Sequence, residues 1–213
     1  MKQTPRLMDM GEERLSNAIV DMANLALDSV RKAIEAYEKG ERVTDAAYKR
    51  ATELSKLSAE VEEIGVDLLA RYQPVASDLR LIKSCLEIAY GFSRFGRYAY
   101  DIAQVLEIYG DLSTCDKTVI HELSEKVTKM IERSIQSFKT RDTELARSLR
   151  KDDDEVDKTY LKYAGALAND KTVTVRCALA STLVLRYLER IADHACYIGD
   201  SVVYIITGTK TVR

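Results

Sequence analysis

Hydrophobic positions recur with helical spacing along almost the whole chain, and the clearest example lies near the C-terminal end. Apolar and small side chains alternate there at steps of four and three, the pattern of a helix packed in a bundle. The stripe consists of Ser181, Leu185, Leu188, Ala192, Ala195, Gly199, Val202 and Ile206. Half of these residues are small, so a neighbouring helix can approach closely. The pattern predicts that this stripe faces the interior of a helical bundle.

The same spacing, interrupted by turn-forming residues, predicts six long helices. The interruptions occur at Gly40, Gln73-Pro74, Gly110, Arg141-Asp142 and Asn169-Asp170, where helices end readily. The expected helices span approximately residues 7–39, 44–72, 74–109, 116–138, 143–168 and 172–207. Helices of this length would be roughly 40 to 50 Å long, and no segment has convincing strand periodicity. An elongated all-α fold is therefore expected.

The two halves of the chain repeat this plan. Residues 80–102 align with residues 176–198 without a gap, and other segments of the two halves match at similar offsets. Self-similarity of this kind indicates a tandem repeat of one supersecondary unit. The sequence therefore predicts two three-helix bundles, the first formed by residues 1–111 and the second by residues 112–213.

Composition agrees with a helical protein and narrows its class. Hydrophobic residues make up 46% and charged residues 31% of the 213 residues, with 9 Gly, 2 Pro and no Trp. The formal net charge is −2, which argues against a nucleic-acid binder because such proteins carry a basic excess. No apolar run approaches the roughly 20 residues that a membrane span needs, and no signal-peptide apolar region opens the chain. We expect a cytoplasmic protein without membrane insertion.

The four cysteines lack CxxC or any other spacing typical of metal ligands. In a cytoplasmic protein, small buried residues are a better interpretation of such cysteines than a disulfide framework. This expectation applies to Cys85, Cys115, Cys177 and Cys196.

Two pairs of carboxylates have the spacing that places them one turn apart on a helix. Glu189 and Asp193 lie beside the small-residue stripe, and Asp153 and Asp157 lie on the preceding helix. Carboxylates that point partly into a bundle interior are costly to desolvate unless a nearby cation balances their charge. If the two helices are antiparallel neighbours, the four side chains would form an oxygen-rich site that suits a hard cation.

An alternative interpretation needs no metal ion. The acids at 152–157 would be first-turn residues favoured by the helix dipole, and Glu189 would pair with Arg186 or Arg190. His194 directly follows Asp193 and is a further candidate ligand, although adjacent residues on a helix point about 100° apart. The pattern alone leaves open whether arginine or a metal ion supplies the positive charge.

Two segments, together with the tandem plan, resemble the PhoU family of phosphate-uptake regulators. They are Gln73–Arg80, which reads QPVASDLR, and Leu188–His194, which reads LERIADH. The resemblance covers nearly the whole chain and implies two three-helix bundles side by side. It also implies a regulator of a phosphate transporter and its sensor kinase, with iron or another metal at Glu/Asp-x-x-x-Asp motifs in the repeats.

The second repeat keeps the family's acidic motif, and the first repeat does not. In the second repeat the resemblance implies a hard metal ion, namely iron, manganese, magnesium or calcium, held by Asp153, Asp157, Glu189 and Asp193. The equivalent first-repeat residues are Ser58, Glu62, Ser93 and Arg97. We therefore expect no metal in the first repeat, where Arg97 would pair with Glu62, Glu60 or Glu63.

Other aromatic and histidine residues have simpler interpretations. His121 is expected to be a solvated helix residue, without a catalytic role. One aromatic group on the third helix is expected to serve core and bundle–bundle packing: Tyr90, Phe92, Phe95, Tyr98, Tyr100 and Tyr109.

No catalytic arrangement is evident in the chain. A Gly-rich phosphate loop and a nucleophile with its base are both missing, and a ferritin-like dimetal enzyme would need His three residues after Glu189, where Ala192 stands. The resemblance to the PhoU family implies a regulator that contacts a phosphate transporter component or sensor protein, and homodimerisation is a further expectation. The alternative is a metal-binding or scaffold helical bundle with no phosphate role.

Overall fold

The chain forms six long helices, and the computed structural model describes residues 7–210. No strand occurs within that range, so the all-α prediction is confirmed. The helices are α1 (Leu7–Lys39), α2 (Thr44–Tyr72), α3 (Ala76–Tyr109), α4 (Thr118–Thr140), α5 (Thr143–Asn169) and α6 (Val175–Thr207).

The predicted helix boundaries agree with the structure to within three residues. Gly40 and Gly110 adopt φ values of +74° and +73° directly after α1 and α3, a conformation that glycine reaches without steric cost. The largest difference is at α6, which begins at Val175 rather than near residue 172. Its N-cap is Thr174, whose hydroxyl accepts a hydrogen bond from the N–H of Cys177 at 3.2 Å, so the local capping chemistry sets the start.

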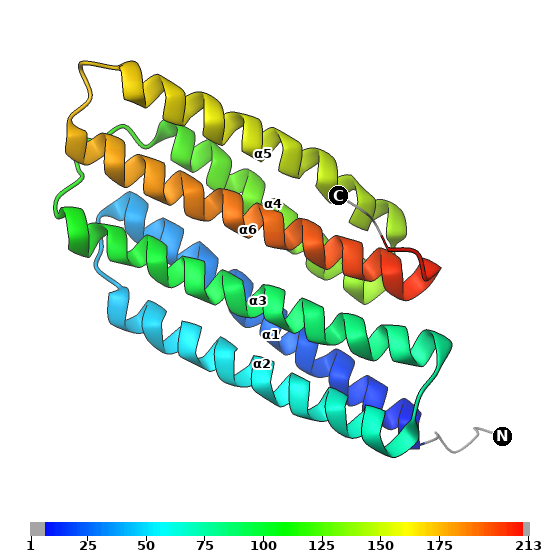
Figure 1. Cartoon of the computed structure of the whole chain (residues 1–213). Helices are drawn as coiled ribbons and strands as arrows, with labels where there is room; N and C mark the ends of the chain where they lie inside the picture. The colour runs from blue at the N-terminus through cyan, green and yellow to red at the C-terminus, as the bar shows by residue number, and fades with distance from the viewer. Residues whose placement is uncertain (1–6, 211–213) are drawn as a thin grey trace.

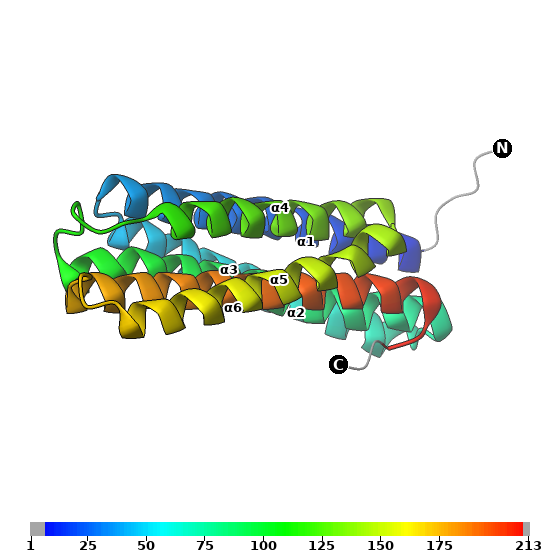
Figure 2. The same ribbon diagram turned by 90° about the horizontal axis from the view of Figure 1, so that it is seen from above.

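The helices form two three-helix bundles that lie side by side (Figure 1). Helices α1, α2 and α3 make one bundle, and α4, α5 and α6 make the other. The bundles meet mainly along α3 and α6, with a second, smaller contact between α1 and α4. Figure 2 shows the same arrangement from above, with α4 over α1 and the connection between the repeats at one end. The predicted boundary at 111/112 falls within this connection, which spans residues 110–117.

The stripe predicted on α6 faces the interior almost throughout. Seven of its eight residues, from Ser181 to Val202, are buried, whereas Ile206 is 40% exposed. The prediction for Ile206 is wrong because it lies in the last turn of α6, where the helix reaches the end of the bundle. The small side chains permit close packing: a Cβ at Gly199 would lie 2.8 Å from the carbonyl oxygen of Ala146 on α5.

One hydrophobic core spans both bundles. A contiguous cluster of buried side chains includes Phe92 and Phe95 of α3 as well as Leu188 and Ala195 of α6. Both phenylalanines are fully buried, which confirms their predicted role. The repeats are therefore two copies of a unit that share one interior.

The cysteines differ from the expectation of four small buried residues. Cys85 and Cys196 are buried, but Cys115 and Cys177 form a disulfide whose Cα atoms lie 5.4 Å apart, within the usual range. The connection between the repeats and the start of α6 lie at the same end of the molecule (Figure 1). Because the pair is separated by 62 residues, only the packing of the two bundles brings the cysteines together.

Candidate functional site

The four predicted carboxylates lie on α5 and α6, which pack against each other. Asp153 and Glu189 are buried, each only 8% exposed. Asp193 is half-buried and Asp157 is exposed. The structure therefore places the four side chains on neighbouring helices, as predicted, but in very different degrees of contact with solvent.

Two arginines on α6 form ion pairs with the acids of the same helix. Arg186 Nη1 lies 2.8 Å from Glu189 Oε1, and Arg190 Nη1 lies 3.3 Å from Asp193 Oδ2. Arg190 Nε also lies 3.8 Å from Glu189 Oε2. Arg186 and Glu189 are three residues apart, as are Arg190 and Asp193, so both pairs form on one helical face. This is the arginine partnership that the second interpretation of the sequence named.

Burial dominates the electrostatics of Glu189. Desolvation raises the pKa of its carboxyl, Arg186 and Arg190 oppose that rise, and the negative charges of Asp193 and Asp157 add to it. Glu189 therefore interacts electrostatically with both Asp193 and Asp157. Glu189 Oε2 is also buried without a hydrogen-bond partner, so solvation by the protein is incomplete at this atom.

The described side chains do not test metal binding at the acidic cluster. Among residues 7–210, no group of three or more His, Cys, Asp or Glu side chains is arranged to hold a metal ion. Arg186 and Arg190 lie beside Glu189 and Asp193 and carry positive charge there. Metal binding by Asp153, Asp157, Glu189 and Asp193 therefore stays a prediction, and no chemical step is assigned to it.

The acidic run on α5 is not at the start of its helix. Helix α5 begins at Thr143, so the acids from Asp152 onward lie more than two turns inside it and gain little from the helix dipole. The first-turn interpretation is therefore wrong. Two of these acids instead bind cations of α4, since Arg133 pairs with Asp152 and Lys126 pairs with Glu155.

The equivalent positions of the first repeat have different chemistry. Ser93 donates its hydroxyl to the Tyr90 carbonyl oxygen at 2.8 Å. Arg97 pairs with Asp101 on its own helix, with Nε 3.0 Å from Oδ1, rather than with Glu62 or its neighbours as predicted. The first repeat therefore places its cation where the second repeat has Asp193.

A cavity of about 780 Å³ runs along the seam between α3 and α6. Its size is typical of ligand and side-chain pockets. Tyr90 and Tyr197, which are 58% and 47% exposed, line it together with Gly91 and Ile198. The two helices are close there, since a Cβ at Gly91 would lie 3.2 Å from Ile198 Cγ1. Helix α2 closes one side with Ser58 and Glu62, the first-repeat counterparts of Asp153 and Asp157.

His194 lies at the centre of an aromatic cluster on this seam. Its ring centroid is 6.1 Å from Tyr90 and 5.9 Å from Tyr98, both on α3, and 5.8 Å from Tyr197 on α6. Because these rings come from both repeats, a molecule bound in the cavity would contact both bundles at once. Exposed aromatic side chains around a concave surface are typical of protein-binding sites.

The sequence does not predict this cavity, because the expectation for Tyr90 is core and bundle–bundle packing. Its ring does contact His194 of the other bundle, but Tyr90 is 58% exposed. The helical spacing of apolar residues indicates that Tyr90 and Tyr197 lie off the buried stripes of α3 and α6. Their neighbours Ala89, Gly91 and Ile198 are buried in the structure. A large aromatic residue off the stripe is a candidate for a binding surface.

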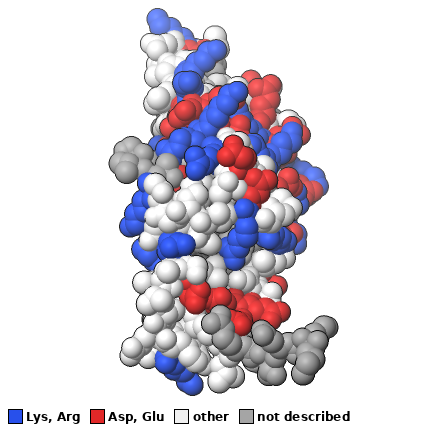
Figure 3. Space-filling model, turned by 90° about the vertical axis from the view of Figure 1, so that its right-hand side faces the viewer, with Lys and Arg blue, Asp and Glu red and all other residues white. Residues whose placement is uncertain are grey.

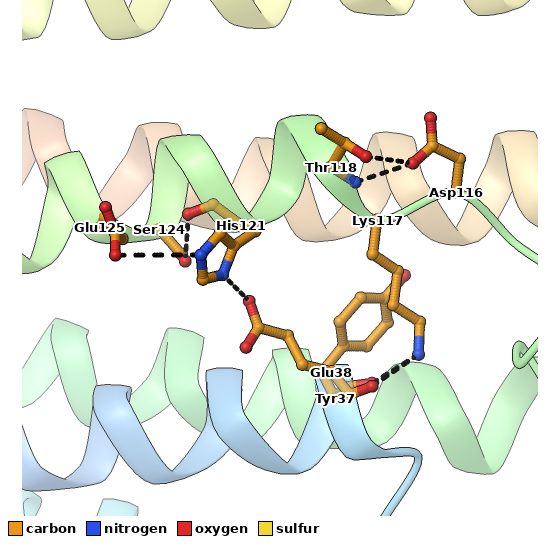
Figure 4. Close-up of polar contacts among 8 residues, drawn as sticks. All are labelled: Tyr37, Glu38, Asp116, Lys117, Thr118, His121, Ser124 and Glu125. Atoms are coloured by element: carbon orange, nitrogen blue, oxygen red, sulfur yellow. Dashed lines mark hydrogen bonds and ion pairs between the residues drawn. The ribbon is translucent and has the colours of Figure 1, made fainter.

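A polar junction joins the repeats at the end that carries the connection (Figure 4). Lys117 donates to the main-chain oxygens of Tyr37 and Glu38 at 3.1 and 3.0 Å, which satisfies carbonyls at the C-terminus of α1. His121 Nδ1 lies 2.8 Å from Glu38 Oε1, and Nε2 lies 3.8 Å from Glu125 Oε1. The bond to Glu38 raises the pKa of His121. His121 is exposed, as expected, but it also links α4 to α1.

Charge is mixed on the outer surface. Figure 3 shows one end of the molecule, where Lys and Arg side chains are interspersed with Asp and Glu. No continuous basic stripe is visible on this face, in agreement with the net charge of −2. None of the helices described between residues 7 and 210 is both long and apolar enough to cross a bilayer.

Comparison with known proteins identifies the family. The PhoU domain profile matches residues 19–106 and again residues 120–202, so the two matches together cover most of the chain. This chain belongs to the PhoU family. The two matched segments correspond to the two three-helix bundles described above, which confirms both the family resemblance and the repeated all-α fold.

The similarity to curated relatives covers nearly the whole of this chain and of theirs. The PhoU homolog 1 of Methanothermobacter thermautotrophicus is 28% identical, covering 96% of this chain and 94% of its own. The homolog of Clostridium acetobutylicum is 29% identical, with 97% of both chains covered. Both are named phosphate-specific transport system accessory proteins.

Two crystal structures have the same fold. The structure of PhoU from Pseudomonas aeruginosa has a TM-score of 0.87 and 27% identity, covering 94% of this chain and 99% of that one. The phosphate transport system regulatory protein PhoU from Streptococcus pneumoniae has a TM-score of 0.90 at 19% identity, over 97% of this chain and 100% of that one. The latter similarity is evidence of fold alone.

Proposed function

We propose that this PhoU family protein regulates phosphate uptake by contacting a component of a phosphate transporter or its sensor protein in the cytoplasm. The full-length match to phosphate-specific transport system accessory proteins carries the proposal. The protein would act by binding and conformational change, without catalysing a reaction.

The cavity along α3 and α6 is the best-supported contact surface for that partner. Aromatic residues with large exposed area supply much of the binding energy at protein interfaces, and Tyr90 and Tyr197 have this character. Their position on different repeats means that a bound partner would respond to the relative placement of the two bundles. Homodimerisation, metal binding at the acidic cluster and the identity of the regulated anion remain predictions.

Copurification from phosphate-replete cells tests the proposal. A phosphate transporter component or sensor should copurify with the tagged wild-type protein, and Tyr90→Ala with Tyr197→Ala should reduce the recovered partner roughly tenfold. Tyr48→Ala is the matched control, because Tyr48 is also 58% exposed but lies outside the cavity.

A deletion strain supplies the functional readout. Phosphate-dependent control of the transporter should be restored by the wild-type gene and by Tyr48→Ala, but not by the double cavity variant. Absence of every transporter component and sensor from the wild-type preparation, combined with normal phosphate control in the deletion strain, would contradict the proposal. Normal control with the double variant would instead exclude only the cavity as the contact surface.

A further inference from the structure

The disulfide between Cys115 and Cys177 ties the connection between the repeats to the first turn of α6. Cys115 lies in the connection formed by residues 110–117, and Cys177 lies three residues after the N-cap Thr174. The bond therefore joins a short, irregular segment to one of the two helices that form the seam.

The connection is also held in place without the disulfide. The N–H of Cys115 donates to the carbonyl oxygen of Leu112 at 3.1 Å, and the Leu112 side chain is buried. Farther along, Lys117 binds the last carbonyls of α1 (Figure 4). If the disulfide opened, these contacts would keep the Cys115 thiol close to Cys177, so the bond could re-form readily.

The surroundings of Cys177 favour a thiolate. Helix α6 is 33 residues long, and the partial positive charge at a helix N-terminus stabilises an anion in the first turn. Arg176 is adjacent in sequence, and Lys117 follows Cys115 by two residues. Both cations act on Asp111, whose pKa is lowered mainly by hydrogen bonds from Ser113 and also by these charges. Asp111, together with Asp116 beside Cys115 and Asp170 in the turn before α6, partly offsets them.

The two cysteine residues differ in exposure. Cys115 is buried, with 9% of its surface exposed, whereas Cys177 is half-buried. An attacking thiolate must approach a sulfur along the S–S axis, so the more accessible Cys177 is the atom that an external thiol would reach first.

We propose that Cys115–Cys177 is a thiol–disulfide exchange site that reacts reversibly with a dithiol reductant. A thiolate of the reductant attacks Cys177 Sγ, the Cys177–Cys115 bond breaks, and Cys115 leaves as a thiolate that takes a proton from water. The second thiol of the reductant, once deprotonated, attacks its own sulfur in the mixed disulfide and releases Cys177 as a thiolate. The protein gains two electrons, and the reductant becomes a disulfide.

The remaining cysteines do not compete in this chemistry. Burial raises the pKa of the Cys85 thiol to about 12, which leaves almost no thiolate at neutral pH. Cys196 is also buried, with 1% of its surface exposed. Thiol reactivity is thus confined to the end of the molecule where the connection meets α6.

Reduction would loosen one end of the molecule and leave the rest intact. The α3–α6 seam and the α1–α4 junction do not depend on the disulfide, so the bundles would stay together. The connection would lose its covalent attachment to α6. Because the cross-link closes a loop of 62 residues, its loss should lower the melting temperature by about 5–15 °C.

Differential alkylation of the full-length, natively folded protein tests the exchange. Protein purified without reductant is treated with N-ethylmaleimide, reduced with dithiothreitol in native buffer, and labelled with iodoacetamide before peptide mass spectrometry. Iodoacetamide should label Cys115 and Cys177 and should leave Cys85 and Cys196 unlabelled. Oxidised glutathione should then restore the bond and the original melting temperature.

Two results would overturn the proposal. A bond that dithiothreitol reduces only after unfolding would make the disulfide a permanent structural link, and four free thiols in the air-purified protein would mean that no bond forms. Cys115→Ser with Cys177→Ser is the control: its melting temperature should match that of the reduced protein and should not change with reductant.

A second measurement examines the role of the α6 N-terminus. In Cys115→Ser, the pH dependence of iodoacetamide labelling reports the pKa of Cys177, which should lie below the ordinary value of about 8.5. Arg176→Glu should raise that pKa in the same background. A Cys177 pKa at or above the ordinary value would contradict the proposed reactivity even if the bond itself is present.

Discussion

The third helices of the two repeats, α3 and α6, pack against each other but carry different charged residues beside the seam. Helix α6 carries buried Glu189 and half-buried Asp193 and answers them with two arginines of its own. At the positions of these acids, α3 has Ser93 and Arg97, and Arg97 pairs with Asp101 one turn later. Duplication has thus preserved the packing surface, while the polar faces beside it have diverged. Equivalent positions of the two repeats therefore predict which residues are buried, but not which residues are charged.

A larger side chain at Gly199, where α6 packs closely against α5, should cause the largest loss of stability. Gly199→Val should destabilise the protein by about 3 kcal/mol, because the added atoms meet the Ala146 carbonyl of α5. The position 96 residues earlier in the chain, Ala103, already accommodates a Cβ. Urea unfolding followed by circular dichroism measures the change.

Gly165→Val is the control for this substitution. A Cβ at Gly165 on α5 would meet nothing within 4 Å, and valine has a higher helix propensity than glycine. Its free energy of unfolding should change by less than about 0.5 kcal/mol. Equal losses of stability in the two variants would show that the close approach at Gly199 does not limit packing.

Removing the cations of α6 should have the next largest effect. Arg186→Ala with Arg190→Ala leaves Glu189 buried and without its ion-pair partners, which should cost about 2 kcal/mol, less than for a fully buried pair because both arginines are partly exposed. Arg71→Ala removes an exposed pair with Asp67 and should leave the free energy of unfolding nearly unchanged, because solvent screens such a pair. The difference between these unfolding free energies, measured in urea, tests whether burial makes the α6 pairs important.

The same double variant tests whether a metal ion can take the place of arginine. With both cations removed, Mn²⁺ should bind the acids of α5 and α6 at least about tenfold more tightly than in the wild type, since oxygen ligands suit this ion. Isothermal titration calorimetry measures the affinity. Adding Glu189→Ala and Asp193→Ala to that variant should abolish the gain, and an unchanged affinity in the arginine variant would count against any latent metal site.

Protonation of Glu189 at low pH should produce the smallest change in stability. The raised pKa of Glu189, caused mainly by burial, means that its ionised form opposes folding. This cost is present above the folded-state pKa and is relieved as the pH falls from there through the ordinary range of a glutamate. The wild type should therefore gain stability relative to Glu189→Gln on acidification, as measured by urea unfolding at a series of pH values.

Much of the fold was predictable because it depends on local signals. Helical spacing identified all six helices, and residues such as Gly40 and Gly110, which reach positive φ freely, marked where helices end. The stripe on α6 was predicted correctly except at Ile206, which lies where the helix leaves the bundle. The repeat placed α3 and α6 in equivalent roles, but only the structure shows that they pack against each other.

The candidate sites were less predictable because they depend on tertiary contacts. Spacing placed Glu189 and Asp193 on one face, but it left open whether an arginine or a metal ion would meet them. The disulfide needs Cys115 and Cys177 to meet across 62 residues of chain, a proximity that no local pattern encodes. Tyr90 is expected to serve core and bundle–bundle packing, whereas its offset from the buried stripe indicates the surface.

The shared interior has a consequence for how the molecule melts and how it can evolve. Side chains of α3 and α6 belong to one contiguous hydrophobic cluster, so separating the bundles would expose the seam of each to water. Neither half has a complete interior of its own, and heating should disrupt both in a single cooperative transition. A substitution on either side of the seam must also suit the opposite copy, so two segments that began as duplicates are now obliged to change together.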